Sequence, residues 1–94
     1  DIAVVGVGLV IHLNNNVCTD ARVVLGAVAP TPLRARRTEA ALIGEQLNPD
    51  RISRAAQIAA EESRPIDDMR GSAWYRRQMI EVLTRRGLQQ LTEL

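Results

Sequence analysis

The sequence predicts an α+β domain in which an antiparallel sheet of N-terminal strands carries three helices packed on one face. Two apolar runs rich in Val, Ile and Leu occupy the first third of the 94 residues. The remainder contains three segments bounded by helix start and stop signals. Because the strands come first and the helices follow, the order is typical of a segregated α+β layout rather than of an alternating βαβ fold.

The two apolar runs, residues 2–13 and 22–29, are predicted to pair as a hairpin with a loop of moderate length. Residues 14–16 are three consecutive Asn, which favour a turn because Asn tolerates left-handed backbone. Pro30 and Pro32 close the second run. Neither run alternates apolar and polar residues, as an antiparallel strand with one solvated face should. We therefore expect both sheet faces to be covered, the second by more of the same protein or by a partner.

The three helices are predicted to run from Thr31 to about Ile43, from Asn48 to Pro65, and from Ser72 toward the C-terminus. Each of these spans opens on a Thr, Asn or Ser, whose side-chain oxygen suits the cap position of a helix. A proline follows the first two caps directly, and proline fits the first turn. The chain has no Phe, so the core beneath these helices must be built from Ala, Val, Leu and Ile.

Composition excludes several classes of protein. The length fits one domain over residues 1–94, and a net charge of +1 gives no basic surplus for nucleic acid. The apolar run of residues 2–13 is too short to span a bilayer. Cys18 is the single cysteine, so neither an intrachain disulfide nor a metal cluster is expected, and a reducing, cytoplasmic compartment fits best.

The glycines at Gly6 and Gly8 resemble part of a dinucleotide-binding fingerprint. That fingerprint needs a third glycine where this chain has Ile11, and a helix must follow it. Since the strand pattern continues instead, we interpret the two glycines as room for another backbone or a ligand. His12 lacks an orienting partner for catalysis and is expected at a strand end. The adjacent carboxylates of residues 61–62 point in different directions on a helix and are expected to be solvated.

The stretch 68–77, DMRGSAWYRR, is the most unusual in the chain. Basic charge is mildly unfavourable at a helix N-terminus. The mismatch indicates that Arg70, Arg76 or Arg77 has a specific partner, and Arg is suited to bidentate pairing with carboxylates. Pairing inside the domain and pairing across an interface are both open.

Four stretches resemble the carbon monoxide dehydrogenase flavoprotein C-terminal domain family. They are residues 1–5 (DIAVV), 21–35 (ARVVLGAVAPTPLRA), 68–77 (DMRGSAWYRR) and 82–86 (VLTRR). The match covers essentially the whole chain in order. The spacing from the Ala-Pro-Thr-Pro turn to the Arg-Gly-Ser-x-x-Tyr-Arg segment also agrees.

The resemblance implies the last domain of the FAD-binding medium subunit of a xanthine dehydrogenase-type molybdenum hydroxylase. In such enzymes electrons pass from a molybdenum centre through two iron–sulfur clusters to FAD. The implied partners are the molybdenum-binding large subunit and the iron–sulfur small subunit. Because two preceding domains hold most of the FAD, residues 1–94 are expected to be a fragment of a longer subunit. The isolated chain is then expected to bind no cofactor or metal and to catalyse nothing.

The resemblance also implies a peripheral contact between the start of the chain and FAD. Ile2, Ala3 and Val4 occupy the first strand at the matching positions. In xanthine dehydrogenase-like relatives a Lys follows the Asp-Ile-Ala triplet, whereas Val4 stands here. Val4 can supply packing but no charge, which favours the carbon monoxide dehydrogenase-like branch.

A subunit interface is expected around the start of the third helix. The residues assigned an interface or structural role there are Arg70, Ser72, Tyr75 and Arg76. The rival hypothesis is a stand-alone interaction module that dimerises through its two-faced apolar strands. The isolated chain would then be a homodimer.

Overall fold

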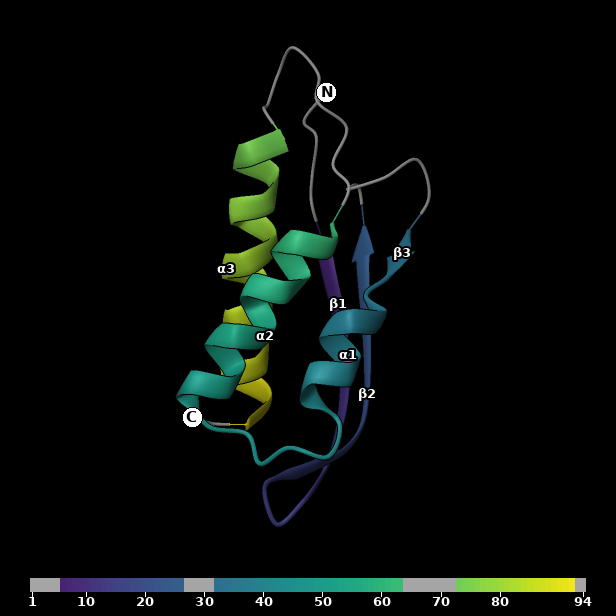
Figure 1. Cartoon of the computed structure of the whole chain (residues 1–94), viewed down its shortest axis with the longest axis vertical. Helices are drawn as coiled ribbons and strands as arrows, with labels where there is room; N and C mark the ends of the chain where they lie inside the picture. Colours follow the sequence, from purple (N-terminus) through teal and green to yellow (C-terminus); the bar gives the residue numbers. More distant parts are fainter. Residues whose placement is uncertain (1–5, 27–31, 64–72, 93–94) are drawn as a thin grey trace.

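The structure, a computed structural model, describes residues 6–26, 32–63 and 73–92. These residues form six elements (Figure 1), which are β1 (Gly6–Asn14), β2 (Val17–Gly26), β3 (Leu33–Arg34), α1 (Arg36–Leu42), α2 (Pro49–Glu62) and α3 (Ala73–Thr92). The strands form one antiparallel sheet in the order β1-β2-β3. Helix α1 packs on β2, α3 packs on β1, and α2 lies against both helices. The α+β class predicted from the sequence is confirmed.

A tight hairpin joins β1 to β2. Asn15 and Asn16 both adopt left-handed backbone, with φ of 53° and 66°, as a two-residue type I′ turn requires. Strand β2 therefore begins at Val17, five residues before the predicted run, and the predicted loop of moderate length is wrong. Thr19 and Asp20 interrupt the apolar pattern at this start. A β-bulge lies here, because His12 pairs with Asp20 and Leu13 pairs with Cys18, which leaves Thr19 without a partner residue on β1.

The first helix starts later than its local signals predict. Leu33 and Arg34 pair with Leu25 and Val24 as strand β3, and the helix begins only at Arg36. The N–H of the next residue, Ala35, donates to the carbonyl of Val23 at 2.7 Å. Pairing with the sheet outweighs the Thr-Pro start signal, of which Thr31 lies outside the described residues.

The second and third helices follow the predicted boundaries where these can be seen. The Asn48 side chain accepts a hydrogen bond from the N–H of Arg51 at 2.7 Å, and Pro49 occupies the first turn of α2. This cap was predicted and is confirmed. Pro65 and Ser72 lie outside the described residues.

The core is aliphatic, as the lack of Phe predicts. Its largest fully buried hydrophobic side chains are Leu25, Leu42, Ile52, Ile80, Leu88 and Val23. Burial of each such side chain is worth about 1.5–3 kcal/mol. Helix α2 contributes Ala55, Ala56 and Ala59, all without exposed surface, and these small residues let α1 and α3 approach it closely.

The sheet has one covered and one open face among the residues that the structure describes. The inward side chains of β2, namely Cys18, Ala21, Val23 and Leu25, are at most 1% exposed. On the opposite face Val10 is 53% and Val24 40% exposed. The cover that we expected over this second face does not come from the described part of the chain.

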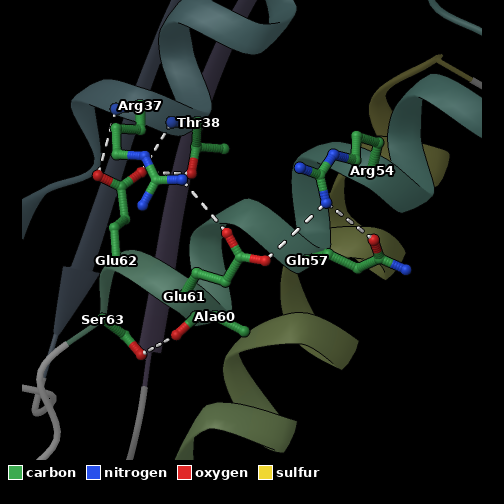
Figure 2. A network of polar contacts seen from close by, with 8 residues as sticks. All are labelled: Arg37, Thr38, Arg54, Gln57, Ala60, Glu61, Glu62 and Ser63. Carbon is green, nitrogen blue, oxygen red and sulfur yellow. Dashed lines mark hydrogen bonds and ion pairs between the residues drawn. The ribbon is translucent and has the colours of Figure 1, made fainter.

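Short helix α1 is held at its start by a carboxylate from α2. Glu62 accepts hydrogen bonds from the N–H groups of Arg37 and Thr38 at 3.2 and 2.7 Å (Figure 2), and from the Thr38 hydroxyl at 2.6 Å. Helix α1 has no side-chain cap of its own at Ala35. Glu62 thus satisfies N–H groups that a helix start leaves unpaired, and its negative charge suits that end of the helix.

Glu61 lies beside this contact and reaches the side chain of Arg37. It forms ion pairs with Arg37 at 3.2 Å and Arg54 at 3.9 Å (Figure 2), and about half of its side chain is exposed. The prediction of solvated carboxylates at residues 61–62 therefore holds for Glu61 and is wrong for Glu62. Both carboxylates reach the start of α1, Glu62 at its backbone and Glu61 at the Arg37 side chain. These contacts join distant segments, which the local pattern does not encode.

A second carboxylate, Glu39, joins α1 to the sheet. It is 5% exposed and accepts from the N–H of Val23 at 2.9 Å and from Nε of Arg34. Burial acts to raise the pKa of Glu39, but the hydrogen bonds from Arg34 and Val23, with the charges of Arg34 and Arg36, lower its pKa overall. Val23 lies next to the residues that pair with β3. The Glu39 carboxylate therefore accepts the backbone hydrogen bond that Val23 would otherwise donate to a neighbouring strand.

Helix α3 approaches β1 so closely that Gly87 faces Leu9. A Cβ on Gly87 would lie 2.5 Å from Cδ1 of Leu9. The glycine does not end the helix, which continues to Thr92. Its lack of a side chain instead sets the distance between helix and strand.

We expect Gly87→Ala and Leu9→Ala to be strongly coupled. Alanine improves helix propensity by about 1 kcal/mol, but its Cβ would displace the half-buried Leu9 side chain, which offsets part of this gain. The change should thus stabilise a Leu9→Ala background by about 1 kcal/mol and stabilise the native chain by clearly less. Urea unfolding of all four variants measures the coupling, and additive effects would contradict the close contact.

We expect Glu39→Gln to cost about 2 kcal/mol at pH 7, because it removes a charge-assisted hydrogen-bond acceptor. Since the folded-state pKa of Glu39 is lowered, the contribution of its carboxylate is full above the unfolded pKa of about 4.3 and is lost as pH falls through the folded pKa. Urea unfolding at pH 7 and pH 3 should show the difference shrinking. Glu61→Gln, on the surface, is the control and should change stability by less than about 1 kcal/mol. An equal Glu39→Gln deficit at both pH values would refute this account.

Candidate functional site

The predicted site residues fall into two groups. Ile2, Ala3, Val4, Arg70 and Ser72 lie outside the described residues. Tyr75 and Arg76 lie in the first turn of α3.

The predicted flavin-contact residues precede β1, and the predicted interface residues lie around the start of α3. The starts of β1 and α3 lie at one end of the molecule. Gly6, which follows the predicted flavin-contact residues in sequence, begins β1 and pairs with Gly26 at the end of β2. The beginning of α3, the end of α2 and the start of β1 lie at the same end in Figure 1. We call this the β1–α3 end, defined by the Gly6–Gly26 pair and the first turn of α3. Flavin contact and subunit interface were predicted from segments that are far apart in sequence, and the fold brings the elements beside them together.

Arg76 and Tyr75 differ in burial. Arg76 is 6% exposed and stands four residues before Ile80, on the stripe that continues through Thr84 and Leu88 into the core. Tyr75 is 55% exposed. Of the two alternatives for the basic helix start, burial by the chain itself favours an intradomain role for Arg76, whereas about half of Tyr75 remains exposed.

Trp74 was not singled out from the sequence. It is 65% exposed, so the single Trp and the single Tyr of the chain are both exposed and adjacent. Aromatic side chains bury large areas and are enriched at interfaces. The composition carried a signal for this exposure. The core is predicted to be aliphatic, so the two neighbouring aromatic residues at a helix start are expected outside it.

The glycines of β1 do not form a phosphate cradle. Gly6 and Gly8 lie in a strand that continues to Asn14 and turns into β2, whereas a pyrophosphate site needs a helix N-terminus after the glycines. A Cβ at Gly6 would meet nothing within 4 Å, and one at Gly8 only the Val24 carbonyl oxygen at 3.9 Å. The described residues therefore do not fit the role of main FAD-holding site, and their packing does not require glycine at either position.

The remaining reactive side chains form no site in the described ranges. His12 is exposed near the end of β1, and its carbonyl accepts from the Thr19 hydroxyl at 3.2 Å. Cys18 is fully buried, and burial raises the pKa of its thiol. Among the described residues no group of three or more His, Cys, Asp or Glu is arranged to hold a metal ion. No helix in that part of the chain is long and apolar enough to cross a membrane.

Comparison with known proteins decides the family. A family model described as the CO dehydrogenase flavoprotein C-terminal domain matches residues 1–91. The chain belongs to this family. The resemblance noted in the sequence is thereby confirmed, and the family is that of a flavoprotein.

The relatives of this CO dehydrogenase flavoprotein C-terminal domain are medium chains of larger enzymes. The glyceraldehyde dehydrogenase medium chain of Sulfolobus acidocaldarius is 35% identical, over 97% of this chain and 32% of that protein. The carbon monoxide dehydrogenase medium chain of Hydrogenophaga pseudoflava is 31% identical, over 94% of this chain and 31% of that protein. The chain thus spans about a third of the length of these relatives.

Solved structures agree with the family. Reconstituted CO dehydrogenase from Oligotropha carboxidovorans matches with a TM-score of 0.84 and 29% identity, over 95% of this chain and 31% of the other. Quinoline 2-oxidoreductase from Pseudomonas putida 86 matches with a TM-score of 0.86 and 26% identity, over the same shares of each chain. The arrangement of sheet and helices is therefore that of this family domain.

We expect Gly8→Ala to stabilise the 94-residue chain by roughly 0.5–1 kcal/mol, because glycine within a strand costs about that much relative to alanine. Thermal unfolding measures the change. Gly44→Ala is the matched control and should destabilise, since Gly44 has a φ of +85° that alanine adopts at a cost. Destabilisation by Gly8→Ala would show that the folded chain itself needs this glycine.

Proposed function

We propose that these residues are the C-terminal domain of the FAD-binding medium subunit of a molybdenum hydroxylase of the carbon monoxide dehydrogenase type. The complete enzyme would pass electrons from a molybdenum centre through iron–sulfur clusters to FAD. This domain would complete the flavin site and the subunit interface without doing chemistry itself. The match of the family to residues 1–91 carries the proposal. The names of the relatives, which are medium chains or subunits of dehydrogenases and of a hydroxylase, support it.

FAD supplies the electron-accepting chemistry when it is bound, and most of its binding groups would lie outside residues 1–94. The geometry of β1 supports this division, because its glycines lead into a strand and not into a helix N-terminus. The isolated chain is accordingly proposed to bind no cofactor. Its residues would line one side of the flavin site rather than bind the phosphate groups of FAD.

The flavin contact is proposed for Ile2, Ala3 and Val4, which precede β1. The outer face of β1 beyond them carries Gly6 and Gly8, whose missing side chains leave room above the sheet. Val4 would contribute packing where some relatives have a Lys, so any positive charge beside the flavin would come from elsewhere.

The subunit interface is proposed for the beginning of α3 and the residues before it, Arg70, Ser72 and Tyr75, with Trp74 added. Exposure of 65% at Trp74 and 55% at Tyr75 supports a partner surface, because adjacent exposed aromatics of this size are costly to leave in water. Arg76 would fix the first turn of α3 from the inside. The molybdenum-binding large subunit and the iron–sulfur small subunit are the proposed partners, in a cytoplasmic enzyme.

We expect a flavin titration to separate this proposal from a self-sufficient flavin domain. The 94-residue chain should bind no stoichiometric FAD, whereas the complete subunit should bind one FAD per chain. Quenching of flavin fluorescence measures both, and Gly8→Ala in the complete subunit tests whether the bare strand face matters for affinity. Tight one-to-one binding by the isolated chain, or a complete subunit without FAD affinity, would contradict the proposed function.

A further inference from the structure

The two edges of the sheet differ in how far their backbone groups are paired. The outer edge of β2 is paired at residues 23–25 by β3, Ala35 and Glu39, and at residues 17–18 by backbone contacts from residues 44–46. At Cys18, for example, the N–H donates to the Glu45 carbonyl at 2.9 Å, and the carbonyl accepts from Gly44 at 2.7 Å. The far edge of β1 pairs with no strand among the described residues.

Strand β1 lacks the usual protection of an open edge. Proteins guard exposed edges with charged residues, prolines or short strands, because unpaired backbone groups invite another strand. Residues 6–14 read GVGLVIHLN, nine residues with no Asp, Glu, Lys, Arg or Pro. The bulge of the hairpin lies on β2 and only at its far end. An unguarded edge of this length indicates that it is covered in the native assembly.

The core is also incomplete beside this edge. The inward side chains of β1, Val7, Leu9 and Ile11, remain partly exposed, while their partners on β2 are fully buried. On α3, Leu83 lies one turn before Gly87, on the side that faces β1. Leu83 is half-buried but is not part of the core cluster. These four residues, Val7, Leu9, Ile11 and Leu83, form what we call the open margin.

We propose that the free edge of β1 pairs with an extended segment from the part of the medium subunit outside residues 1–94, which adds a fourth strand to the sheet. Strand addition supplies backbone hydrogen bonds to the edge, and alternate side chains of the added strand fill pockets on the covered face. The added strand would therefore present apolar residues to the open margin. This inference rests on the proposed function, since it requires a longer subunit.

The length of the relatives points to the occupant. About two thirds of each relative lies outside the region that this chain matches. A remainder of that length in the same subunit would be long enough to supply the added strand. A segment of the same subunit also needs no separate association step, because it is tethered to the edge.

A second copy of the chain fits this edge poorly. Antiparallel pairing of β1 with its own copy would place both α3 helices on the same side of a continuous sheet. Neighbouring strands are about 4.8 Å apart, whereas packed helix axes need about 8–10 Å. Because α3 packs on β1 itself through the Gly87–Leu9 contact, the two helices would compete for one space. A lone strand without its own helix avoids the conflict.

Hydrogen exchange of the β1 amides tests the proposal in the complete subunit and in the 94-residue chain. Amides of residues 6–14 that point away from β2 should exchange at least about tenfold more slowly in the complete subunit. Leu83→Lys in the complete subunit should restore fast exchange, because a charge then faces the added strand. Gln89→Lys is the control on the opposite side of α3, where Gln89 is exposed, and it should leave the protection unchanged. Thermal unfolding of each 94-residue variant verifies that the chain stays folded.

The outcomes separate this inference from the proposed function. Equal β1 exchange in both proteins, or protection that appears in the 94-residue chain together with a dimer in sedimentation, overturns the added strand. FAD content is measured on the same complete subunit. Bound FAD with unprotected β1 rejects the added strand alone, whereas protected β1 in a subunit that binds no FAD supports the strand and rejects the flavin role.

Discussion

The buried carboxylate of Glu39 is the interaction on which the rest of the described fold depends. It satisfies the N–H of Val23, the residue at which sheet pairing passes from a strand to a side chain, and it holds Arg34 at the end of β3. A single side chain thus fixes α1 against both β2 and β3. With α1 fixed, Glu62 can cap it from the end of α2, and α2 in turn supports α3. Burial of a charged group is tolerable here because both of its partners donate hydrogen bonds to it.

This chain of contacts explains why the sequence predicted some features and not others. The Asn-Pro start of α2, the turn at residues 14–16 and the order of strands and helices are local signals, and the structure confirms them. Strand β3 depends on its pairing with Val24 and Leu25, and the cap of α1 depends on Glu62. These partners are distant in sequence, so local signals favoured an early helix instead. The bulge at Thr19 likewise hid the start of β2. For the site, family resemblance predicted the segments, and only the fold shows that Arg76 is buried while Trp74 and Tyr75 are exposed.

The exposed features of the described surface are unevenly distributed. The aromatic pair of α3 and the bare glycines of β1 lie toward one end, and the open margin runs along one side of the sheet. The covered face, by contrast, is closed by the chain's own helices. The described residues thus pack around an aliphatic core and leave one sheet face and the aromatic pair exposed.

The two-residue turn at Asn15 and Asn16 has a practical consequence. It lies at the opposite end of β1 from Gly6, roughly 27 Å away for an extended strand of this length. Both Asn residues are exposed, and surface turns of this kind accept inserted sequence more readily than strands or helices do. A fluorophore or an affinity handle introduced there would report on the domain inside a longer protein while leaving the β1–α3 end untouched.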